Sequence, residues 1–381
     1  MSRGPVPYSL LLSALILTAL TIGAAFAFKA AGKMPDFEVY WRAGARAMAA
    51  EPLYREEDGH YQFKYLPAFA MLAIPAALLP LTVAKGIWFT ISVALVAVLL
   101  ALSLQLLAVM HKPPWLLITI TLVAMAKFYG HELVLGQVNL LFAVVVVLAV
   151  LAGERQRRVE AGLLMTLAVI IKPYAVIFLP WLAAERAVTT LAVAGLTLAA
   201  ALLLPALAYG IPGTVALHHD WWRTVTESTA PNLLNADNVS LAGMYTKWFG
   251  ASTTAATLTL VTAIALLGVV GIAFLARRRV SVPAGLEAAM LLTCIPLLSP
   301  QGWDYVFLLS TPAVMYLVNG DRELPSPLRV LTWVALAIIA FTIYDVIGRR
   351  AYGAFMAISA VTVCYLILIG AMVTLRLRRI A

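Results

Sequence analysis

Apolar residues in this chain form repeated blocks of about 20 positions, separated by short polar segments. An α-helix of that length crosses the hydrocarbon core of a bilayer, which is roughly 30 Å thick. The first block covers 8–28. It is expected to stay in the protein as a first span, because no small-residue cleavage site follows it. The pattern therefore predicts an all-α polytopic membrane protein.

The blocks predict about twelve transmembrane helices, and an even number of spans puts both termini on one side, expected to be the cytoplasm. Two predicted spans, 159–172 and 174–184, are short and meet at Lys172-Pro173, so a single broken helix is the competing interpretation. The full set of spans after the first is 83–110, 115–130, 138–152, 159–172, 174–184, 187–208, 252–275, 284–298, 303–319, 328–346 and 353–375.

Composition agrees with a lipid environment. Hydrophobic residues make up 63% of the chain and charged residues 12%, against about 25% charged residues in a soluble domain. This difference excludes an ordinary soluble enzyme. A net charge of +9 would suggest nucleic acid in a soluble chain, but in a membrane chain it indicates basic cytoplasmic loops, and no nucleic-acid partner is expected. Cys294 and Cys364 both lie in apolar blocks, which argues against a disulfide framework or a thiolate metal site.

Three arginine clusters orient the chain, because basic residues near span ends favour the cytoplasm. All three are cytoplasmic only if 66–80 lies outside as a juxtamembrane helix, and its prolines favour such an interfacial segment. In the competing topology 66–80 crosses the membrane, 159–184 is one helix and the first cluster lies outside. The preferred topology leaves a long external loop over about 209–249. The clusters are Arg155/Arg157/Arg158, Arg277/Arg278/Arg279 and Arg376/Arg378/Arg379.

The first external segment carries Asp36 among aromatic residues. Asp36 follows Pro35 and is a good helix N-cap, and the Ala-rich sequence up to Pro52 predicts an amphipathic helix on the bilayer surface. A carboxylate in such a place can also serve as a partly desolvated general base. Tyr40, four residues on, is expected on the same helix face as Asp36, whereas Glu38 points to another face.

The polar motifs, taken together and in order, resemble glycosyltransferase family 87. This family belongs to the GT-C superfamily of integral-membrane transferases, which use polyprenyl-phosphate sugars. No single motif is specific, and the resemblance rests on their order over most of the chain. The motifs are Asp36-x-x-Val39-Tyr40, Pro52-Leu53-Tyr54, Phe63-x-Tyr65-x-Pro67, Pro75, Trp88, Gly136-Gln137-Val138-Asn139-Leu140, Ile171-Lys172-Pro173, Asn238-x-Ser240-Leu241 and Ser299-Pro300-x-x-Trp303.

The resemblance implies a GT-C-like fold with external juxtamembrane helices after the first span. It divides the single domain, 1–381, into a catalytic module over about 1–208 and an external loop with a C-terminal membrane half over about 209–381. It also implies inverting transfer of a hexose, expected to be mannose, from a polyprenyl-monophosphate donor to a lipid or glycan acceptor outside the cell membrane. A transporter or flippase of lipid-linked sugars is the alternative function.

By resemblance, Asp36 is the general base, and no cofactor or metal is expected. Lys172 is the first candidate to neutralise the donor phosphate, because an ionisable residue in an apolar run suggests function. The alternative is that Lys172 extends to the membrane interface. Arg42 and Lys64 are further phosphate candidates. The candidate substrate-binding residues are Tyr40, Tyr65, His131, Gln137, Asn139, Asn238, Ser240, Trp303 and Asp304.

Several of these motifs have other interpretations. Gln137 and Asn139 lie at a break between apolar runs, where a helix cap or an interhelical hydrogen bond is equally consistent. Trp221-Trp222 fits either an interfacial aromatic belt or stacking on a carbohydrate. The run 218–220, His-His-Asp, is not expected to bind a metal, because adjacent residues cannot all face one ion. Tyr305 stands where the family often has a histidine, which leaves Asp304 or a histidine from another loop as the substitute.

Overall fold

The computed structural model describes residues 21, 23–276 and 283–378. Every regular element in this part of the chain is a helix, and its only β pairing is an isolated bridge between Asn238 and Trp303. The prediction of an all-α protein is confirmed. Most of the first predicted span, the arginine cluster 277–279 and Arg379 lie outside the described residues.

Four of the described helices are long and apolar enough to cross a membrane: α4 (Leu81–Gln105), α5 (Pro114–Leu135), α13 (Thr253–Leu275) and α18 (Ala360–Arg378). Two bent pairs raise this number to six. They are α9 (Val188–Leu203) with α10 (Ala206–Glu227), bent by 94°, and α16 (Ser326–Phe341) with α17 (Tyr344–Ala357), bent by 109°. The chain is therefore a helical membrane protein, and the twelve predicted spans are not confirmed.

The other predicted spans form shorter helices: α6 (Asn139–Glu154), α7 (Arg158–Ile171), η3 (Pro173–Ile177) with α8 (Phe178–Ala184), α14 (Ala284–Leu298), and η5 (Asp304–Ser310) with α15 (Thr311–Asn319). A helix of 16 residues is about 24 Å long, which is less than the roughly 30 Å of a bilayer core. The predicted span 353–375 was wrong at its start, because residues up to Ala357 belong to the bent helix α17.

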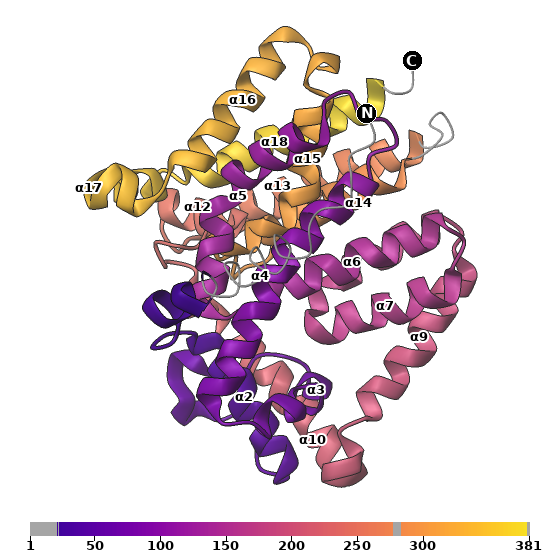
Figure 1. The fold of residues 1–381 in the computed structure, drawn as a ribbon, viewed down its shortest axis with the longest axis vertical. Helices are drawn as coiled ribbons and strands as arrows, with labels where there is room; N and C mark the ends of the chain where they lie inside the picture. The colour runs from indigo at the N-terminus through magenta and orange to yellow at the C-terminus, as the bar shows by residue number, and fades with distance from the viewer. Residues whose placement is uncertain (1–20, 22, 277–282, 379–381) are drawn as a thin grey trace, which may run out of the picture.

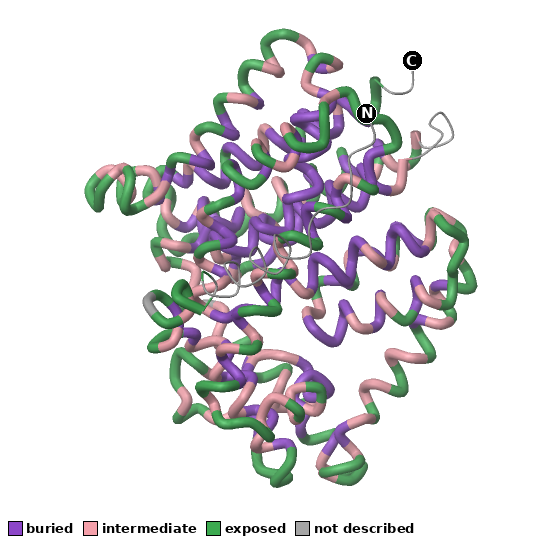
Figure 2. The backbone as a smooth tube through the Cα atoms, in the orientation of Figure 1, coloured by how far each residue is buried: buried purple, intermediate pink, exposed green. Residues whose placement is uncertain are grey.

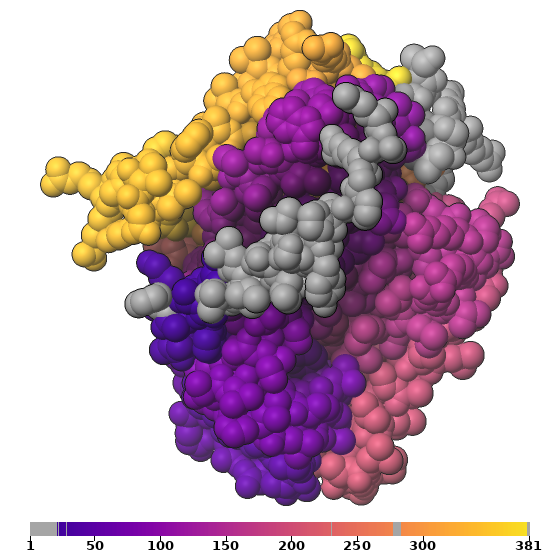
Figure 3. Space-filling model, in the orientation of Figure 1, coloured from indigo at the N-terminus to yellow at the C-terminus, as the bar shows by residue number. Residues whose placement is uncertain are grey.

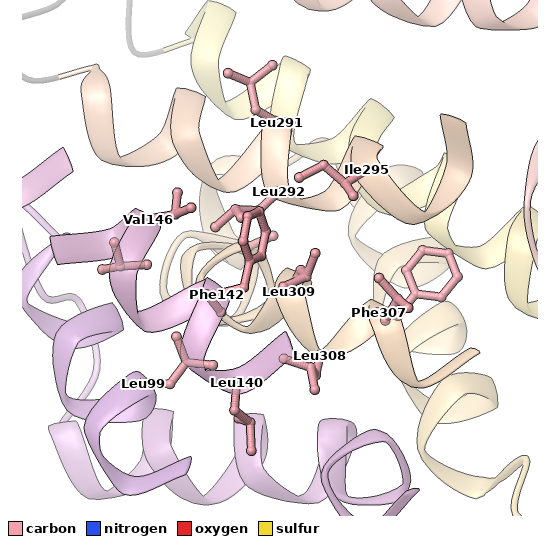
Figure 4. Close-up of a cluster of buried hydrophobic side chains, with 14 of the residues drawn as sticks. Leu99, Leu140, Phe142, Val146, Leu291, Leu292, Ile295, Phe307, Leu308 and Leu309 are labelled. Carbon is pink, nitrogen blue, oxygen red and sulfur yellow. The ribbon is translucent and has the colours of Figure 1, made fainter. Parts of the chain in front are cut away.

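The core lies where α4, α6, α14 and η5 pack together, in the middle of the molecule (Figure 2). Every residue of η5 is buried, and Figure 4 shows Leu309 of η5 beside Phe142 of α6 and Leu292 of α14, whereas Phe307 lies apart from them. A helix with apolar residues on all sides belongs in the interior, and α6 is buried along nearly its whole length. Members of this core are Leu99, Leu140, Phe142, Val146, Leu291, Leu292, Ile295, Phe307, Leu308 and Leu309.

A cap of four helices covers one end of this bundle. It consists of α2 (Pro35–Met48), η2 (Glu56–Tyr61), α3 (Pro67–Ala77) and α10, which lie at the lower end of Figure 1 and side by side in Figure 3. Helices α2 and α3 touch closely, because a Cβ atom at Gly44 would lie 2.6 Å from the Ala73 carbonyl oxygen. Tyr209 of α10 donates a hydrogen bond to the Glu51 carbonyl (2.8 Å).

Three sequence predictions about this end meet different outcomes. The segment 66–80 contains only the 11-residue helix α3, about 16 Å long and too short for a span. Asp36 is not the N-cap. Met34 occupies that position with a left-handed backbone. Asp36 lies in the first turn of α2, where its negative charge interacts favourably with the helix dipole. The expected loop over 209–249 is mostly helical, with α10, α11 (Thr229–Asn232) and α12 (Leu241–Phe249).

Polar contacts join helix ends at the other end of the bundle. Arg155, after α6, donates a hydrogen bond to Gln105 at the end of α4 (2.8 Å). His111, in the next turn, lies 3.1 Å from the Glu323 carboxylate. Arg378 of α18 donates to the Glu323 carbonyl (2.9 Å). The first arginine cluster and the described C-terminal arginine Arg378 therefore lie at the same end.

Arg376 was predicted, as a member of the third arginine cluster, to be a basic residue at the end of a span, but it lies in the interior. Its side chain is completely buried and pairs with the equally buried Glu287 of α14, at 2.9 Å. Trp181 of α8 donates to the other carboxylate oxygen of Glu287 (2.9 Å). A buried charge requires such a partner, because the low-dielectric interior penalises an isolated ion. The pair therefore links α14 to α18.

Candidate active site

A cavity of about 460 Å³ lies between the cap and the ends of the bundle helices. That volume is in the range of small-molecule binding sites. Residues from α2, η2, α5, the Lys172 break, α10 and the loop before η5 line it. Nine of the predicted site residues are on its wall: Asp36, Tyr40, Lys64, Tyr65, His131, Gln137, Lys172, Trp303 and Asp304.

One amide group organises the Asp36 side of the cavity. Gln137 donates from Nε2 to an Asp36 carboxylate oxygen at 2.9 Å. Its Oε1 accepts from the hydroxyls of Tyr40 (2.8 Å) and Tyr65 (3.2 Å). The two hydroxyl oxygens lie 2.6 Å apart, and because each carries one proton, the three contacts among Tyr40, Tyr65 and Gln137 share two protons. The prediction that Asp36 and Tyr40 share a helix face is confirmed, and Glu38 turns away to pair with Lys85 (3.3 Å).

The start of α2 is docked onto the break between α5 and α6. Met34 donates its backbone N–H to the Val134 carbonyl (3.0 Å), and Trp88 donates to the Gly136 carbonyl (3.0 Å). Gly136 has φ of +70°, and a Cβ atom there would lie 2.7 Å from the Phe37 Cβ. Glycine is therefore required for the close approach that brings Gln137 within reach of Asp36.

The environment of Asp36 suits a proton acceptor. Burial raises the pKa of the Asp36 carboxyl above its ordinary value, while the hydrogen bond from Gln137 and the positive charge of Lys172 oppose that rise. A carboxylate with a raised pKa is a stronger base and still has a hydrogen-bonded, fixed orientation. Burial also raises the pKa of Tyr40 well above 10, so Tyr40 remains a neutral hydrogen-bond donor.

Lys172 lies at the break between α7 and η3, where the backbone is extended (φ −144°). Its ammonium group is 5.2 Å from the centre of the Tyr65 ring. No hydrogen bond or ion pair ties this ammonium to another residue in the described part of the chain, and it faces the cavity. The helix is interrupted here, because α7 ends at Ile171 and Pro173 begins a new turn, and both the two-span and the broken-helix interpretation predicted this interruption.

Lys64 is a second cation on the same side of the cavity. The Lys64 carbonyl accepts a hydrogen bond from Trp221 of α10 (3.2 Å), which fixes this part of the loop. Burial lowers the pKa of the Lys64 ammonium, and the nearby Asp36 carboxylate acts against this. The two ammonium groups make this side of the cavity suited to an anionic group.

A second group of lining residues combines an imidazole, carboxylates and aromatic rings. His131 donates from Nδ1 to the Asp304 carboxylate at 3.0 Å, a tautomer assigned from this contact. The His131 ring meets the Tyr305 ring edge-on, with centroids 5.0 Å apart. Trp303 and Asp237 line the same cavity. Asp304, one of the two expected substitutes for a histidine at position 305, is thus hydrogen-bonded to His131, a histidine of α5.

Four predicted site residues do not line the cavity. Arg42 lies 3.8 Å from Asp58, which Arg46 holds at 2.5 Å. Asn139 is buried and donates to Glu132 (2.8 Å). Asn238 donates to the Pro300 carbonyl (2.8 Å), and Ser240 caps α12 through the Gly243 N–H (2.9 Å). The last three stabilise turns next to the cavity, as the helix-cap interpretation of Asn139 allowed.

The cavity also contains residues that sequence reasoning did not select. His60 and Tyr61 come from η2, Tyr174 follows Lys172-Pro173, and Asp237 precedes the Asn238 turn. No spacing rule points to them, because three separate loops bring them together. Proximity to a selected motif was the only signal, and it applied to Tyr174 and Asp237.

The members of the His-His-Asp run make separate contacts. His218 donates to the Thr214 carbonyl (2.8 Å), and Asp220 pairs with Arg223 (3.5 Å). Within the described ranges, no three histidine, cysteine, aspartate or glutamate side chains are grouped as a metal site would require.

The model of glycosyltransferase family 87 matches residues 63–300, which is more than half of the chain. This range includes Lys64, Tyr65, His131, Gln137 and Lys172, and it begins after Asp36. The comparison with curated proteins finds no match.

Proposed function

Because the chain belongs to glycosyltransferase family 87 and is a glycosyltransferase, we propose that its cavity transfers a hexose from a polyprenyl-monophosphate donor to an acceptor hydroxyl. Mannose is the proposed hexose. The observation that carries the proposal is the juxtaposition of the oriented carboxylate Asp36 with two cavity-facing cations, Lys172 and Lys64. Family membership supports a transferase and gives no support to the alternative of a transporter.

The proposed reaction is a single inverting displacement. The acceptor oxygen attacks C1 of the sugar, and its proton passes to the Asp36 carboxylate. The C1–O bond to the phosphate breaks, and its electron pair stays on the phosphate oxygen. One carboxylate is sufficient, because a phosphate departs without being protonated. Gln137 holds Asp36 in the orientation to receive the proton, and Tyr40 and Tyr65 hold Gln137.

The leaving phosphate gains negative charge as the bond breaks, and fixed positive groups stabilise it in the transition state. Lys172 is proposed as its main partner, since its ammonium faces the cavity and no described residue holds it in an ion pair. Lys64 is proposed as the second. Arg42 is not proposed, because Asp58 draws it away from the cavity.

We place the cavity on the external face of the cell membrane and the arginine-rich end in the cytoplasm. The contacts of Arg155 and Arg378 at the end opposite the cap support this orientation, because basic residues favour the cytoplasmic side. The shorter helices α6, α7 and α14 are then proposed to cross with their flanking residues, in a GT-C-like arrangement over 1–381. Helices α2 and α3 would be the external juxtamembrane pair.

The test is the Asp36→Asn variant of the full-length protein in detergent. A labelled short-chain polyprenyl-phosphate mannose serves as donor, and a lipid extract supplies the acceptor. Asparagine keeps the size of Asp36 but cannot take up the proton, so transfer should fall by about 100-fold to 10,000-fold. The exposed Asp345→Asn variant is the matched control. Transfer by Asp36→Asn within twofold of the parent, with an unchanged unfolding temperature, would refute the assignment.

A further inference from the structure

The lining of the cavity divides into two sides by the electrostatic neighbours of its carboxylates. Lys64 and Lys172 interact with Asp36 and form the Asp36 side. Asp304 and His131 interact with Asp237 and form the other side, and His131 also acts on Asp36. These groups come from α5, from the loop before α12 and from the start of η5, so separate parts of the chain build this second side.

Asp304 and Asp237 are held at this wall by neighbours. Asp304 is buried and receives the His131 N–H at 3.0 Å. Asp237 receives the Tyr352 hydroxyl of α17 at 3.5 Å. The antiparallel bridge between Asn238 and Trp303 joins the two loops. Asp237 and Asp304, each next to a bridged residue, therefore lie on opposite strands of the same bridge. Their positions are therefore fixed relative to the Trp303 ring.

This side presents negative charge to the cavity. Burial and the nearby Asp304 carboxylate raise the pKa of Asp237, while His131 opposes the rise. Lys247 lies behind Asp237, but its ammonium donates to three carbonyls, those of Ala236, Asn238 and Met356 at 2.7, 2.7 and 3.2 Å, and it does not line the cavity. An anionic group placed at this wall would meet the Asp237 carboxylate and the Asp304 carboxylate, and only Asp304 has the His131 imidazole as a direct partner, at 3.0 Å.

The same wall is suited to an uncharged sugar. Carboxylates accept hydrogen bonds from hydroxyl groups, and these charge-assisted bonds are stronger than neutral ones. Trp303 and Trp221 are half-buried on the cavity surface, and their flat apolar faces can cover the C–H side of a pyranose ring. Asn235 and Gln301 add amide groups on the same surface.

We propose that Asp237, Asp304 and Trp303 form the acceptor subsite, and that it selects a neutral sugar hydroxyl over an anionic lipid headgroup. This proposal rests on the proposed transfer reaction. The donor phosphate occupies the cationic side and the acceptor sugar occupies the carboxylate side. His131 stands between the two functions, because its imidazole interacts electrostatically with both Asp36 and Asp237.

The experiment compares two acceptors with the same diacylglycerol tail: a neutral monohexosyl diacylglycerol and the anionic phosphatidylinositol. The labelled polyprenyl-phosphate mannose is the donor in both cases. The parent enzyme should use the neutral acceptor with at least a tenfold higher kcat/KM. In Asp237→Asn, the KM for the neutral acceptor should rise about fivefold. The ratio of kcat/KM for the neutral acceptor to kcat/KM for phosphatidylinositol should fall, because asparagine keeps the size of Asp237 but removes its charge.

The exposed Asp345→Asn variant is the control and should keep the preference of the parent. Equal or better use of phosphatidylinositol by the parent enzyme overturns the subsite proposal, as does an unchanged preference in a folded Asp237→Asn variant. Consumption of the donor distinguishes failure of the acceptor subsite from failure of the proposed transfer reaction. If the donor is consumed in an Asp36-dependent manner but anionic acceptors are preferred, only the subsite proposal fails. If the donor is consumed neither with these two acceptors nor with the lipid extract, the proposed function fails with it.

Discussion

At the scale of single residues, Gln137 connects the chemistry of the cavity to its structure. Its amide oxygen accepts from two tyrosines, Tyr40 and Tyr65, which leaves the Nε2 group directed at Asp36. This arrangement fixes which end of the amide faces the carboxylate. The pair Asp36 and Tyr40 was predictable from their spacing of four residues, whereas their common partner comes from 97 positions beyond Tyr40.

The Gln137→Met variant tests this role through pH. The lost hydrogen bond stabilised the charged form of Asp36, so the pKa of Asp36 should rise further above its ordinary value. The acid limb of the pH–rate profile should therefore move to higher pH, and the rate at neutral pH should fall.

Gln105→Met, at the charged end of the bundle, is the control and should keep the parent profile. An acid limb that does not move in Gln137→Met would show that Asp36 is not the group whose protonation limits the rate.

At the scale of elements, a glycine-dependent junction positions α2 over the break between α5 and α6. The left-handed backbone of Gly136 ends α5, and the absence of a side chain admits Phe37 and Met34. The motif Gly136-Gln137-x-Asn139 indicates a break between two helices. It does not reveal that the first turn of α2 fills the space at that break.

Gly136→Ala should lower the free energy of unfolding by about 2–4 kcal/mol, because a left-handed backbone disfavours alanine and the added methyl overlaps Phe37. Activity should fall with it, since the distance between Asp36 and Gln137 must increase. Thermal unfolding in detergent, with transfer measured on the folded fraction, gives both values.

Gly130→Ala is the matched control, because a Cβ atom at Gly130 of α5 meets nothing within 4 Å. It should leave stability unchanged or slightly increased. Equal stability of Gly136→Ala and the parent would contradict the role of this junction.

At the scale of the whole molecule, the cap and the arginine-bearing end lie at opposite ends of α4, a helix of 25 residues. Hydropathy and charge predicted this separation in outline. They did not distinguish Arg376, which is buried against Glu287, from Arg378, which is exposed at the surface. The two differ only in which side of α18 they occupy.

The proposed topology predicts the accessibility of single cysteines. In a background with Cys294 and Cys364 replaced by alanine, Glu57→Cys in η2 should react with a membrane-impermeant maleimide on intact spheroplasts. Arg157→Cys, after α6, should react only after permeabilisation. Labelling of Arg157→Cys on intact spheroplasts would instead favour the topology in which 66–80 crosses the membrane.

Features that depend on neighbouring residues were predictable from the amino-acid order alone: an all-helical membrane protein, the α2 helix, the break at Lys172-Pro173 and the shared face of Asp36 and Tyr40. Each follows from local periodicity or from proline stereochemistry. Which polar residues meet was visible only in the folded chain. Folding brought Asp237, His60 and Tyr174 into the cavity and left Arg42, Asn139, Asn238 and Ser240 outside it. The physical reason is that packing between distant segments, such as the contact of Gly136 with Phe37, sets the direction of each side chain.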